Sequence, residues 1–266
     1  VDIGHIQHDS QSLEVLGDMA SQVVRVILER AARYGRLASG QLQEVEEVER
    51  RTQSELAIIC QRLGKVQRLA LFDLDGTLVR GRFIVALAQR YNKSEERTPR
   101  IAQLFAGLSK KDLEELARAL PLQPGAAECV VALKRLGFRV GIITDSFFLV
   151  AETIRRRVFA DFSIAHVLRF RQGILTGEVH LCQAMFHPHG CTAHSLCKAN
   201  ALLHLSEQFQ LPPSQILAVG DTDADACMLR LAGLGVAFQP KSETLRQAAK
   251  FAIENSLDEL VPLVEA

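Results

Sequence analysis

The sequence lacks an excess of charge and a long apolar run, two features that would point to a polyanion or a membrane as partner. Its 266 residues carry 31 basic and 31 acidic side chains, so the formal net charge is zero and extensive nucleic-acid binding is not expected. No apolar run approaches the roughly 20 residues that span a bilayer, and no signal peptide opens the chain. We therefore expect no nucleic-acid partner and no membrane segment in this chain.

The sequence also lacks a disulfide framework. Its six cysteines are not spaced like those of a small secreted domain, which favours a reducing compartment and hence a cytoplasmic location. Apolar residues make up 48% and charged residues 23% of the chain, values typical of a folded globular protein. The chain begins with Val1 rather than Met, which favours a processed product or a fragment of a longer protein.

Two amphipathic patterns in residues 1–64 predict an α-helical hairpin. Apolar residues recur at helical spacing over 11–35 and over 41–64. Each apolar stripe needs a partner, which could be the rest of the chain, a second copy or upstream sequence. We expect this hairpin to pack as a separate unit and to mediate homodimer formation or attachment. Glu14 and Asp18, in an E-x-x-x-D pattern, weakly resemble the helices of PhoU-type phosphate-signalling proteins.

Residues 67–266 alternate between strand-like and helical segments. Strands that alternate with helices imply right-handed crossovers and a mostly parallel sheet covered on both faces. The prediction is therefore a Rossmann-like α/β domain over 67–266, with a small helical insert at about 83–121 between the first two strands. In such sheets, ligands bind at the carboxyl ends of the strands.

Polar side chains lie at the ends of three predicted strands. Asp73 and Asp75 come directly after the first strand, Thr144 ends the strand "FRVGIIT", and Asp221 follows the strand "QILAVG". Adjacent ionised carboxylates repel one another, so a D-x-D-G sequence taken alone is either a solvated turn or a cation site. Three polar strand ends at one edge of a parallel sheet favour the site.

The order of these motifs, with Lys198 on a helix before the last of them, resembles the haloacid dehalogenase (HAD) superfamily of phosphotransferases. The resemblance spans about residues 67–266 and is greatest for the phosphoserine phosphatase-like branch, which has a helical cap between the first two motifs. By this resemblance, Asp73 is the nucleophile that forms an aspartyl-phosphate, and Asp75 is the general acid and base. Thr144 and Lys198 bind the phosphoryl oxygens.

The resemblance also implies a Mg²⁺ cofactor held by acidic residues. Asp73 and Asp221 contribute carboxylates, the backbone carbonyl of Asp75 faces the metal, and Asp225 anchors the group. A divalent cation neutralises carboxylates that otherwise repel one another. The expected activity is hydrolysis of a small-molecule phosphate ester. A phosphotransferase or mutase and a catalytically silent regulatory module are the alternatives.

Two positions near the expected substrate depart from the phosphoserine phosphatase pattern. Arg82, with Arg80 beside it, stands where that family carries a Glu for the substrate ammonium, and Asp145 follows Thr144 where the family has Gly. A guanidinium repels an ammonium and attracts an anion. We therefore count Arg82 and Asp145 among the substrate-binding residues and expect an ester with a second anionic group, in preference to phosphoethanolamine or phosphocholine. Phosphoserine phosphatase proper is the alternative, and Arg82 could equally be a surface residue paired with a Glu.

Residues 180–198 contain half of the histidines and half of the cysteines of the chain. Cys191, His194 and Cys197 have the spacing C-x2-H-x2-C, and His187 lies just upstream. Cysteine and histidine side chains are the usual ligands of tetrahedral Zn²⁺. A Zn²⁺ site and a structured loop with free thiols both remain open.

Overall fold

The computed structural model describes residues 56–91, 101–187, 189–194 and 196–265. The helical hairpin expected in residues 1–64, with Glu14 and Asp18, lies outside this part of the chain except for a helix at 56–63. Its expected role in association therefore stays a prediction.

Strand β1 (Arg68–Phe72) lies in the middle of a seven-stranded sheet formed by the described residues. The strand order is β4-β3-β2-β1-β5-β6-β7, and neighbouring strands are parallel except for the antiparallel hairpin of β3 and β4. This mostly parallel sheet confirms the predicted Rossmann-like α/β fold. The other strands are β2 (Phe138–Phe147), β3 (Phe162–Arg171), β4 (Ile174–His180), β5 (Ile216–Gly220), β6 (Leu234–Phe238) and β7 (Phe251–Ile253).

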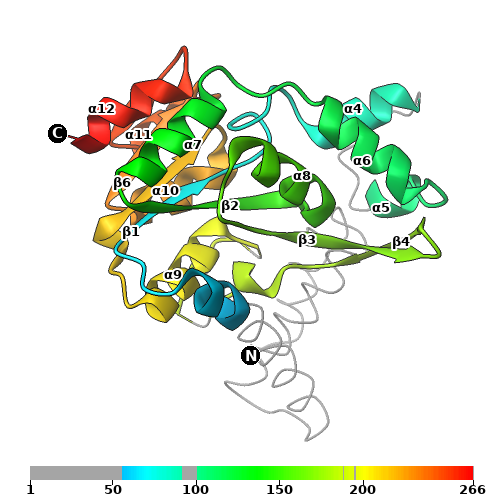
Figure 1. The fold of residues 1–266 in the computed structure, drawn as a ribbon, viewed down its shortest axis with the longest axis horizontal. Coiled ribbons are helices and arrows are strands. Elements are labelled where there is room, and N and C mark those ends of the chain that lie inside the picture. The colour runs from blue at the N-terminus through cyan, green and yellow to red at the C-terminus, as the bar shows by residue number, and fades with distance from the viewer. Residues whose placement is uncertain (1–55, 92–100, 188, 195, 266) are drawn as a thin grey trace, which may run out of the picture.

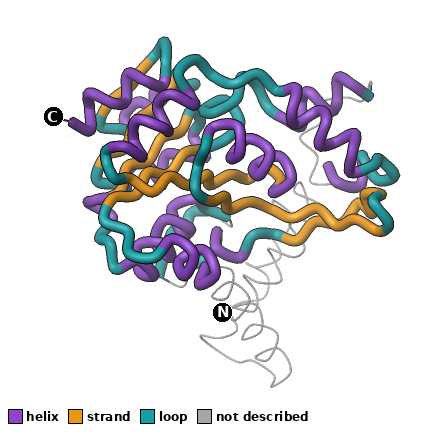
Figure 2. The backbone as a smooth tube through the Cα atoms, in the orientation of Figure 1, coloured by secondary structure: helices purple, strands orange, loops and turns teal. Residues whose placement is uncertain are grey.

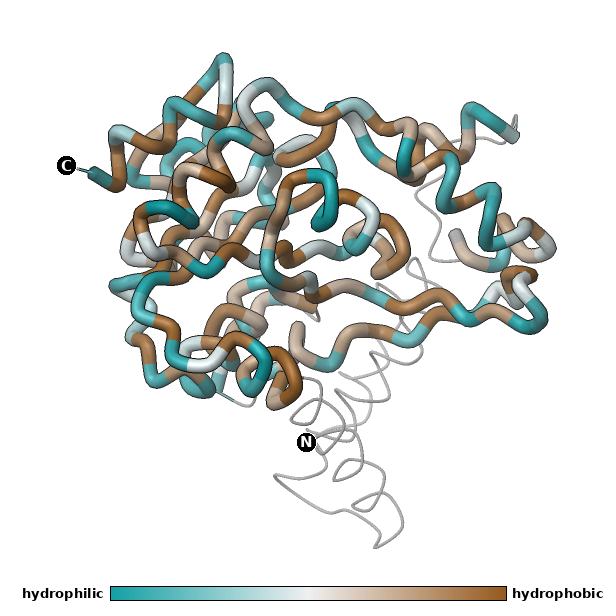
Figure 3. The backbone as a smooth tube through the Cα atoms, viewed as in Figure 1, coloured by the Kyte–Doolittle hydropathy of each residue, from teal (hydrophilic) through white to brown (hydrophobic). Residues whose placement is uncertain are grey.

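Helices cover both faces of the sheet because its central strands are apolar on both sides. Along β1, Leu69 and Leu71 belong to one core cluster while Ala70 and Phe72 belong to another, as the alternation of side chains along a strand requires. Hydrophobic and hydrophilic residues alternate along the helices (Figure 3), and none of the described helices is long and apolar enough to cross a membrane. The helices around the sheet are α7 (Ala126–Arg135), α8 (Phe148–Val158), α9 (Lys198–Phe209), α10 (Ala226–Leu231), α11 (Glu243–Ala248) and α12 (Leu260–Glu265), with short 3₁₀ turns η1 (Gln183–Met185), η2 (Pro213–Gln215), η3 (Asp223–Asp225) and η4 (Leu257–Glu259).

Three of the helices between β1 and β2 lie away from β1, beside the far end of the β3–β4 hairpin (Figures 1 and 2). These cap helices, which fall within the insert expected at about 83–121, are α4 (Phe83–Arg90), α5 (Ile101–Leu104) and α6 (Lys110–Ala119). The long β3–β4 hairpin reaches them: the amide of Gly107 donates to the carbonyl of Leu175 at 2.9 Å, and the amide of Lys110 donates to that of Gly173 at 2.7 Å. The cap helices are therefore joined to the sheet both through the chain and through the hairpin.

Strand β2 continues past Thr144, where the sequence predicts that the strand ends. Its pairing with β3 is irregular between Ile143 and Phe147, so Thr144 and Asp145 lie in a stretch without regular ladder pairing. Phe147 is only 6% exposed, and its burial keeps the backbone extended beyond the polar residues. The irregular stretch lies at the carboxyl end of the strand, where ligands of parallel sheets bind.

The helix at 56–63 packs against the core of the sheet domain. Leu56 is 2% exposed and shares a core cluster with Val66 and Leu69. At the outer surface of the helix, the guanidinium of Arg62 donates to the carbonyl of Asp161 at 2.6 Å. For this part of the predicted hairpin, the apolar stripe is buried against the rest of the chain.

We predict that Leu56→Ala lowers the free energy of unfolding by about 2 to 5 kcal/mol, the usual effect of truncating a buried leucine. Ile58 on the same helix is 65% exposed, so Ile58→Ala is the matched control and should change stability by less than about 0.5 kcal/mol. Urea unfolding followed by circular dichroism measures both. Equal effects of the two substitutions would contradict the packing of this helix.

Candidate active site

The loop after β1 brings two acidic strand ends together because of a glycine. The amide of Gly76 donates to the carbonyl of Val79 at 3.0 Å, which closes the turn. Gly76 has φ +91°, a conformation that L side chains rarely adopt, and a Cβ there would lie 2.1 Å from Oδ2 of Asp221. The close approach of this loop to Asp221 therefore requires glycine.

Lys198 lies between two carboxylates at the first position of α9. Its Nζ is 2.6 Å from Oδ1 of Asp73 and 2.7 Å from Oδ1 of Asp225. All three side chains are buried, so water screens these ion pairs little. Burial alone would lower the pKa of Lys198, but the charges of Asp225 and Asp73 outweigh it and raise that pKa well above its ordinary value. Lys198 is thus a fixed positive charge beside Asp73.

Asp225 organises the turn that follows β5. Its Oδ2 accepts hydrogen bonds from the backbone amides of Asp221 at 3.2 Å and Thr222 at 3.1 Å. Thr222 and Asp225 also form a capping box at the start of η3. Because Oδ1 is paired with Lys198, both oxygens of Asp225 have protein partners. Asp225 therefore positions Lys198 and Asp221 relative to each other.

The acidic group carries more negative charge than the neighbouring lysines balance. Oxygens of Asp73, Asp221 and Asp225 all lie within 4.8 Å of one another, while Lys198 and the half-exposed Lys241, 3.5 Å from Asp221, supply positive charge. Apart from Lys198, no hydrogen-bond donor of the described residues reaches Oδ1 of Asp73. Burial, reinforced by the charge of Asp225, raises the pKa of Asp73 well above its ordinary value. A hard divalent cation such as Mg²⁺ fits this group of buried oxygens.

Asp75 lies where the loop meets the first cap helix. Its Oδ1 accepts a hydrogen bond from the amide of Phe83 at 3.0 Å, and its carboxylate is not a member of the acidic group around Asp73. Burial raises the pKa of Asp75 to about 6, although this hydrogen bond and the charge of Arg82 oppose the rise. A carboxyl group with such a pKa can both donate and accept a proton near neutral pH.

Thr144 and Asp145 differ in their access to solvent. Thr144 is fully buried, and its Oγ1 accepts a hydrogen bond from the amide of Ser146 at 3.1 Å. Asp145 is reached by solvent, although protein surrounds it closely. That crowding alone would raise the pKa of Asp145, but the positive charge of Lys198 and, more weakly, Arg82 lowers it. Asp145 therefore lies close enough to Lys198 for their charges to interact.

Arg82 lies near enough to two of the acidic residues for its charge to act on them. It is exposed and occupies the N-cap position of α4, and its charge acts on the carboxyls of both Asp75 and Asp145. Arg80 is also exposed, and its amide donates to the carbonyl of Pro121 at 2.8 Å.

Three buried or charged side chains at the site were not singled out from the sequence. Nε2 of Gln123 donates to the carbonyl of Gly76 at 2.9 Å and holds the loop after β1. Lys241 approaches Asp221 at 3.5 Å, and His166 is fully buried on β3, where burial lowers its pKa to about 4 although Asp145 opposes the shift. No local sequence signal identifies these residues, because their partners are distant in the chain.

The His/Cys-rich segment divides into two groups. His187 does not join the cysteines: its Nε2 lies 3.0 Å from Oε1 of Glu207, its Nδ1 accepts a hydrogen bond from the amide of His189, and its ring lies beside that of His204. Cys227 of α10 lies beside the other two cysteines and His194 in place of His187, and it was not among the ligands expected from the sequence. The second group consists of Cys191, His194, Cys197 and Cys227.

Comparison with known proteins agrees with the fold and the motifs. Residues 190–261 match the family model of haloacid dehalogenase-like hydrolases. The chain is 34% identical over 209 residues to a phosphoserine phosphatase of Mycobacterium tuberculosis, a match that covers 72% of this chain and 48% of that protein. It is 30% identical over 206 residues to the phosphoserine phosphatase of Idiomarina loihiensis, and this match covers 71% of this chain and 89% of that protein. The chain thus spans about half the length of the first relative and most of the second.

The same fold occurs in a solved structure described as a phospho-aspartyl intermediate analogue of phosphoserine phosphatase. Its TM-score is 0.63 at 24% sequence identity, and the match covers 75% of this chain and 99% of that one. The strand order of this chain, the acidic motifs at the carboxyl ends of its strands and its sequence relatives all indicate the same family. The chain belongs to the haloacid dehalogenase superfamily, in its phosphoserine phosphatase-like branch.

Proposed function

We propose that this protein is a Mg²⁺-dependent phosphatase that hydrolyses a small phosphate ester through an aspartyl-phosphate on Asp73. The observation that carries the proposal is the buried contact of 2.6 Å between Lys198 Nζ and Asp73 Oδ1. A lysine fixed in this way orients the carboxylate and adds positive charge where a phosphoryl group would be transferred. Its second partner, Asp225, keeps it in place when Asp73 reacts.

In the first step, Lys198 holds one oxygen of Asp73 and the other oxygen attacks phosphorus. The phosphorus–oxygen bond to the leaving group breaks as the bond to Asp73 forms. Lys198 and the hydroxyl of Thr144 bind the equatorial phosphoryl oxygens, whose charge they balance. This step conserves the phosphoryl group as an acyl phosphate on Asp73.

Asp75 handles the protons. In its protonated form it donates to the leaving alkoxide, and the resulting carboxylate accepts a proton from the water that hydrolyses the aspartyl-phosphate. The pKa of about 6 that burial gives this group suits both roles. The hydrogen bond from Phe83 fixes Asp75 relative to the first cap helix, so the position of the proton-transferring carboxyl group depends on the position of that helix.

Asp73, Asp221 and the backbone carbonyl of Asp75 are the residues that hold Mg²⁺ in this proposal, with Asp225 as their anchor. When bound, Mg²⁺ neutralises these carboxylates and stabilises charge on the transferring phosphoryl group. The fit rests on the surplus of buried negative charge and on the oxygens of the acidic group, which lie within 4.8 Å of one another.

Arg82 is the residue that selects the substrate in this proposal. It is exposed at the start of the cap helices and acts electrostatically on Asp75 and Asp145. An arginine there recognises a second anionic group on the substrate. Phosphoserine, which the names of the relatives indicate as their substrate, carries such a carboxylate. The neighbouring Asp145 repels anions, so it suits a cationic part of the substrate better than the phosphoryl group itself.

We predict that Asp73→Asn lowers turnover of p-nitrophenyl phosphate with Mg²⁺ by roughly 1,000-fold or more, because the amide is not a nucleophile. The melting temperature should not fall, since the substitution removes one of several clustered negative charges and leaves Lys198 paired with Asp225. Asp223→Asn, an exposed acid in the same motif as Asp221, is the control and should keep its activity.

Two results would contradict the proposed hydrolysis. If the wild-type protein turned over no ester in a broad phosphate panel, the catalytically silent alternative would be correct. If the phosphoryl group were recovered on a second hydroxyl compound instead of as inorganic phosphate, the protein would be a phosphotransferase or mutase.

We predict that the wild-type protein prefers phosphate esters with a carboxylate, such as phosphoserine or phosphoglycolate, over phosphoethanolamine. Arg82→Glu should lower kcat/KM for these anionic esters by roughly ten- to a hundred-fold, the equivalent of one charged hydrogen bond of about 1.5 to 3 kcal/mol. The same substitution should change turnover of p-nitrophenyl phosphate much less. Arg90→Glu, at the exposed far end of α4, is the charge-matched control.

The wild-type protein could instead prefer phosphoethanolamine, with a preference that Arg82→Glu leaves unchanged. That result would show that Arg82 does not bind the leaving group. The phosphatase activity itself would stand, because the Asp73→Asn comparison tests it separately.

A further inference from the structure

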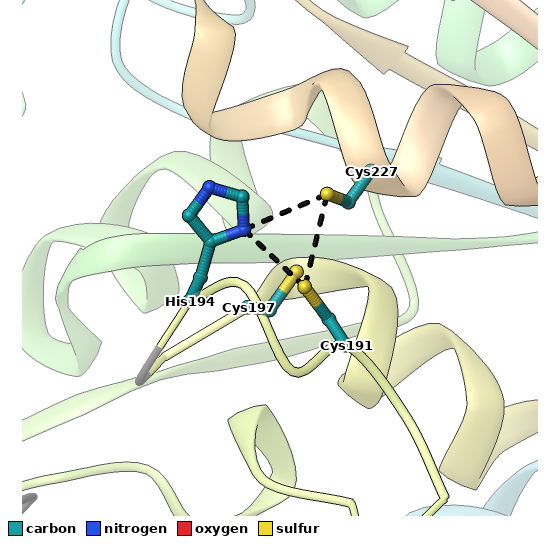
Figure 4. A group of neighbouring side chains, drawn as sticks. All are labelled: Cys191, His194, Cys197 and Cys227. Carbon is teal, nitrogen blue, oxygen red and sulfur yellow. Dashed lines mark hydrogen bonds between the residues drawn. The ribbon is translucent and has the colours of Figure 1, made fainter.

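Three thiols and one imidazole from two distant segments meet beside the active site. Three come from the loop that precedes α9, and the fourth comes from α10 (Figure 4). Nδ1 of His194 lies 3.3 Å from Sγ of Cys191 and 3.6 Å from Sγ of Cys227, and these two sulfurs are 3.9 Å apart. Together with Cys197, the four ligand atoms all lie within 4.8 Å of one another.

These distances match the edges of a metal-centred tetrahedron. Bonds of about 2.3 Å from zinc to sulfur and about 2.0 Å to nitrogen give S···S edges of about 3.8 Å and S···N edges of about 3.5 Å. The separation of 3.9 Å between Cys191 and Cys227 is much longer than a disulfide bond of about 2.05 Å. The three atoms with these separations are therefore spaced as ligands around a common centre, and Sγ of Cys197 lies within 4.8 Å of each of them.

The loop that supplies three of these side chains is held by groups that are not ligands. Asn200 is 2% exposed, accepts a hydrogen bond from the amide of Cys191 at 2.8 Å and donates one to the carbonyl of Met185 at 2.9 Å. The amide of Cys197 donates to the same carbonyl at 3.1 Å. A Cβ on Gly190 would lie 2.0 Å from Oδ1 of Asn200, so the loop reaches Asn200 only with glycine there. Such supporting contacts preorganise a metal site.

We propose that Cys191, His194, Cys197 and Cys227 bind one Zn²⁺ in a closed tetrahedral site. Three thiolates and an imidazole favour Zn²⁺ over Mg²⁺ or Ca²⁺, which prefer oxygen ligands. Four protein ligands leave no open coordination position, so the site is structural rather than catalytic. It is distinct from the oxygen-lined acidic group around Asp73.

The zinc site joins the two segments that carry the ion pair of the active site. Cys197 directly precedes Lys198, and Cys227 follows Asp225 by one intervening residue. A metal bound to both cysteines fixes the start of α9 against the start of α10, and with them the contact of 2.7 Å between Lys198 and Asp225. Zinc therefore supports the position of Lys198 from outside the reacting atoms. It also stabilises the fold, because it binds the folded chain and not the separated segments.

The test measures the zinc content of two samples by inductively coupled plasma mass spectrometry. One is the protein purified without added metal, and the other is the same protein after incubation with Zn²⁺ and gel filtration. The wild-type protein should hold one zinc per chain, and Cys227→Ser and His194→Ala should lose it. His194 is exposed, so its removal leaves the packing intact, and His194→Cys should restore binding. Cys60→Ser, on the helix at 56–63, is the control that should keep the metal.

Replacement of zinc by Co²⁺ provides a readout that does not depend on activity. The wild-type protein should give the visible absorption of tetrahedral Co²⁺ with thiolate charge-transfer bands, and His194→Ala should not. Removal of zinc should lower the melting temperature of the wild-type protein, measured with Mg²⁺ restored, and leave that of His194→Ala unchanged. A wild-type protein that takes up no zinc and gives no tetrahedral Co²⁺ spectrum would overturn the proposal and identify the cluster as free thiols.

Discussion

The buried contacts of Lys198 with Asp73 and Asp225 are the interaction on which the arrangement of the site depends. They connect the end of β1, the start of α9 and the turn after β5, three elements that the chain order separates widely. Loss of Lys198 would leave the buried carboxylates of Asp73 and Asp225 without their shared partner and would be strongly destabilising. The three elements must therefore be in place together, and the same requirement that orders Asp73 also orders the fold around it.

The side chains proposed to react are positioned by residues that take no part in the reaction. Gly76 lets the loop after β1 approach Asp221, and Gln123 ties that loop to the segment returning from the cap helices. Asp225 uses both of its oxygens on Lys198 and on the turn after β5. Accurate placement of reacting groups depends on such support, and here most of it comes from backbone groups and a few buried polar side chains.

The sheet and the position of the motifs could be predicted because both follow from local sequence. Apolar runs alternate with helical patterns, and parallel strands put their carboxyl ends at one edge, so Asp73, Thr144 and Asp221 were expected together. The remaining features depend on packing between distant segments. Cys227 joins Cys191 only because α10 packs against α9, and His187 leaves that group because Glu207 on α9 offers its ring nitrogen a partner. Neither fact is encoded in the spacing of the residues concerned.

The β3–β4 hairpin has a mechanical consequence for the cap helices. Backbone hydrogen bonds link its tip to the segment between α5 and α6. The cap helices are therefore attached to the sheet both by their chain connections and by the hairpin. A movement that opens the site and keeps these bonds must carry the hairpin along and bend the edge of the sheet. If the cap helices move as the lids of many enzymes do, where opening often limits turnover, the stiffness of this edge would resist that movement. A residue far from any reacting atom, at the turn of the hairpin, can thus alter the frequency of opening without changing the chemistry.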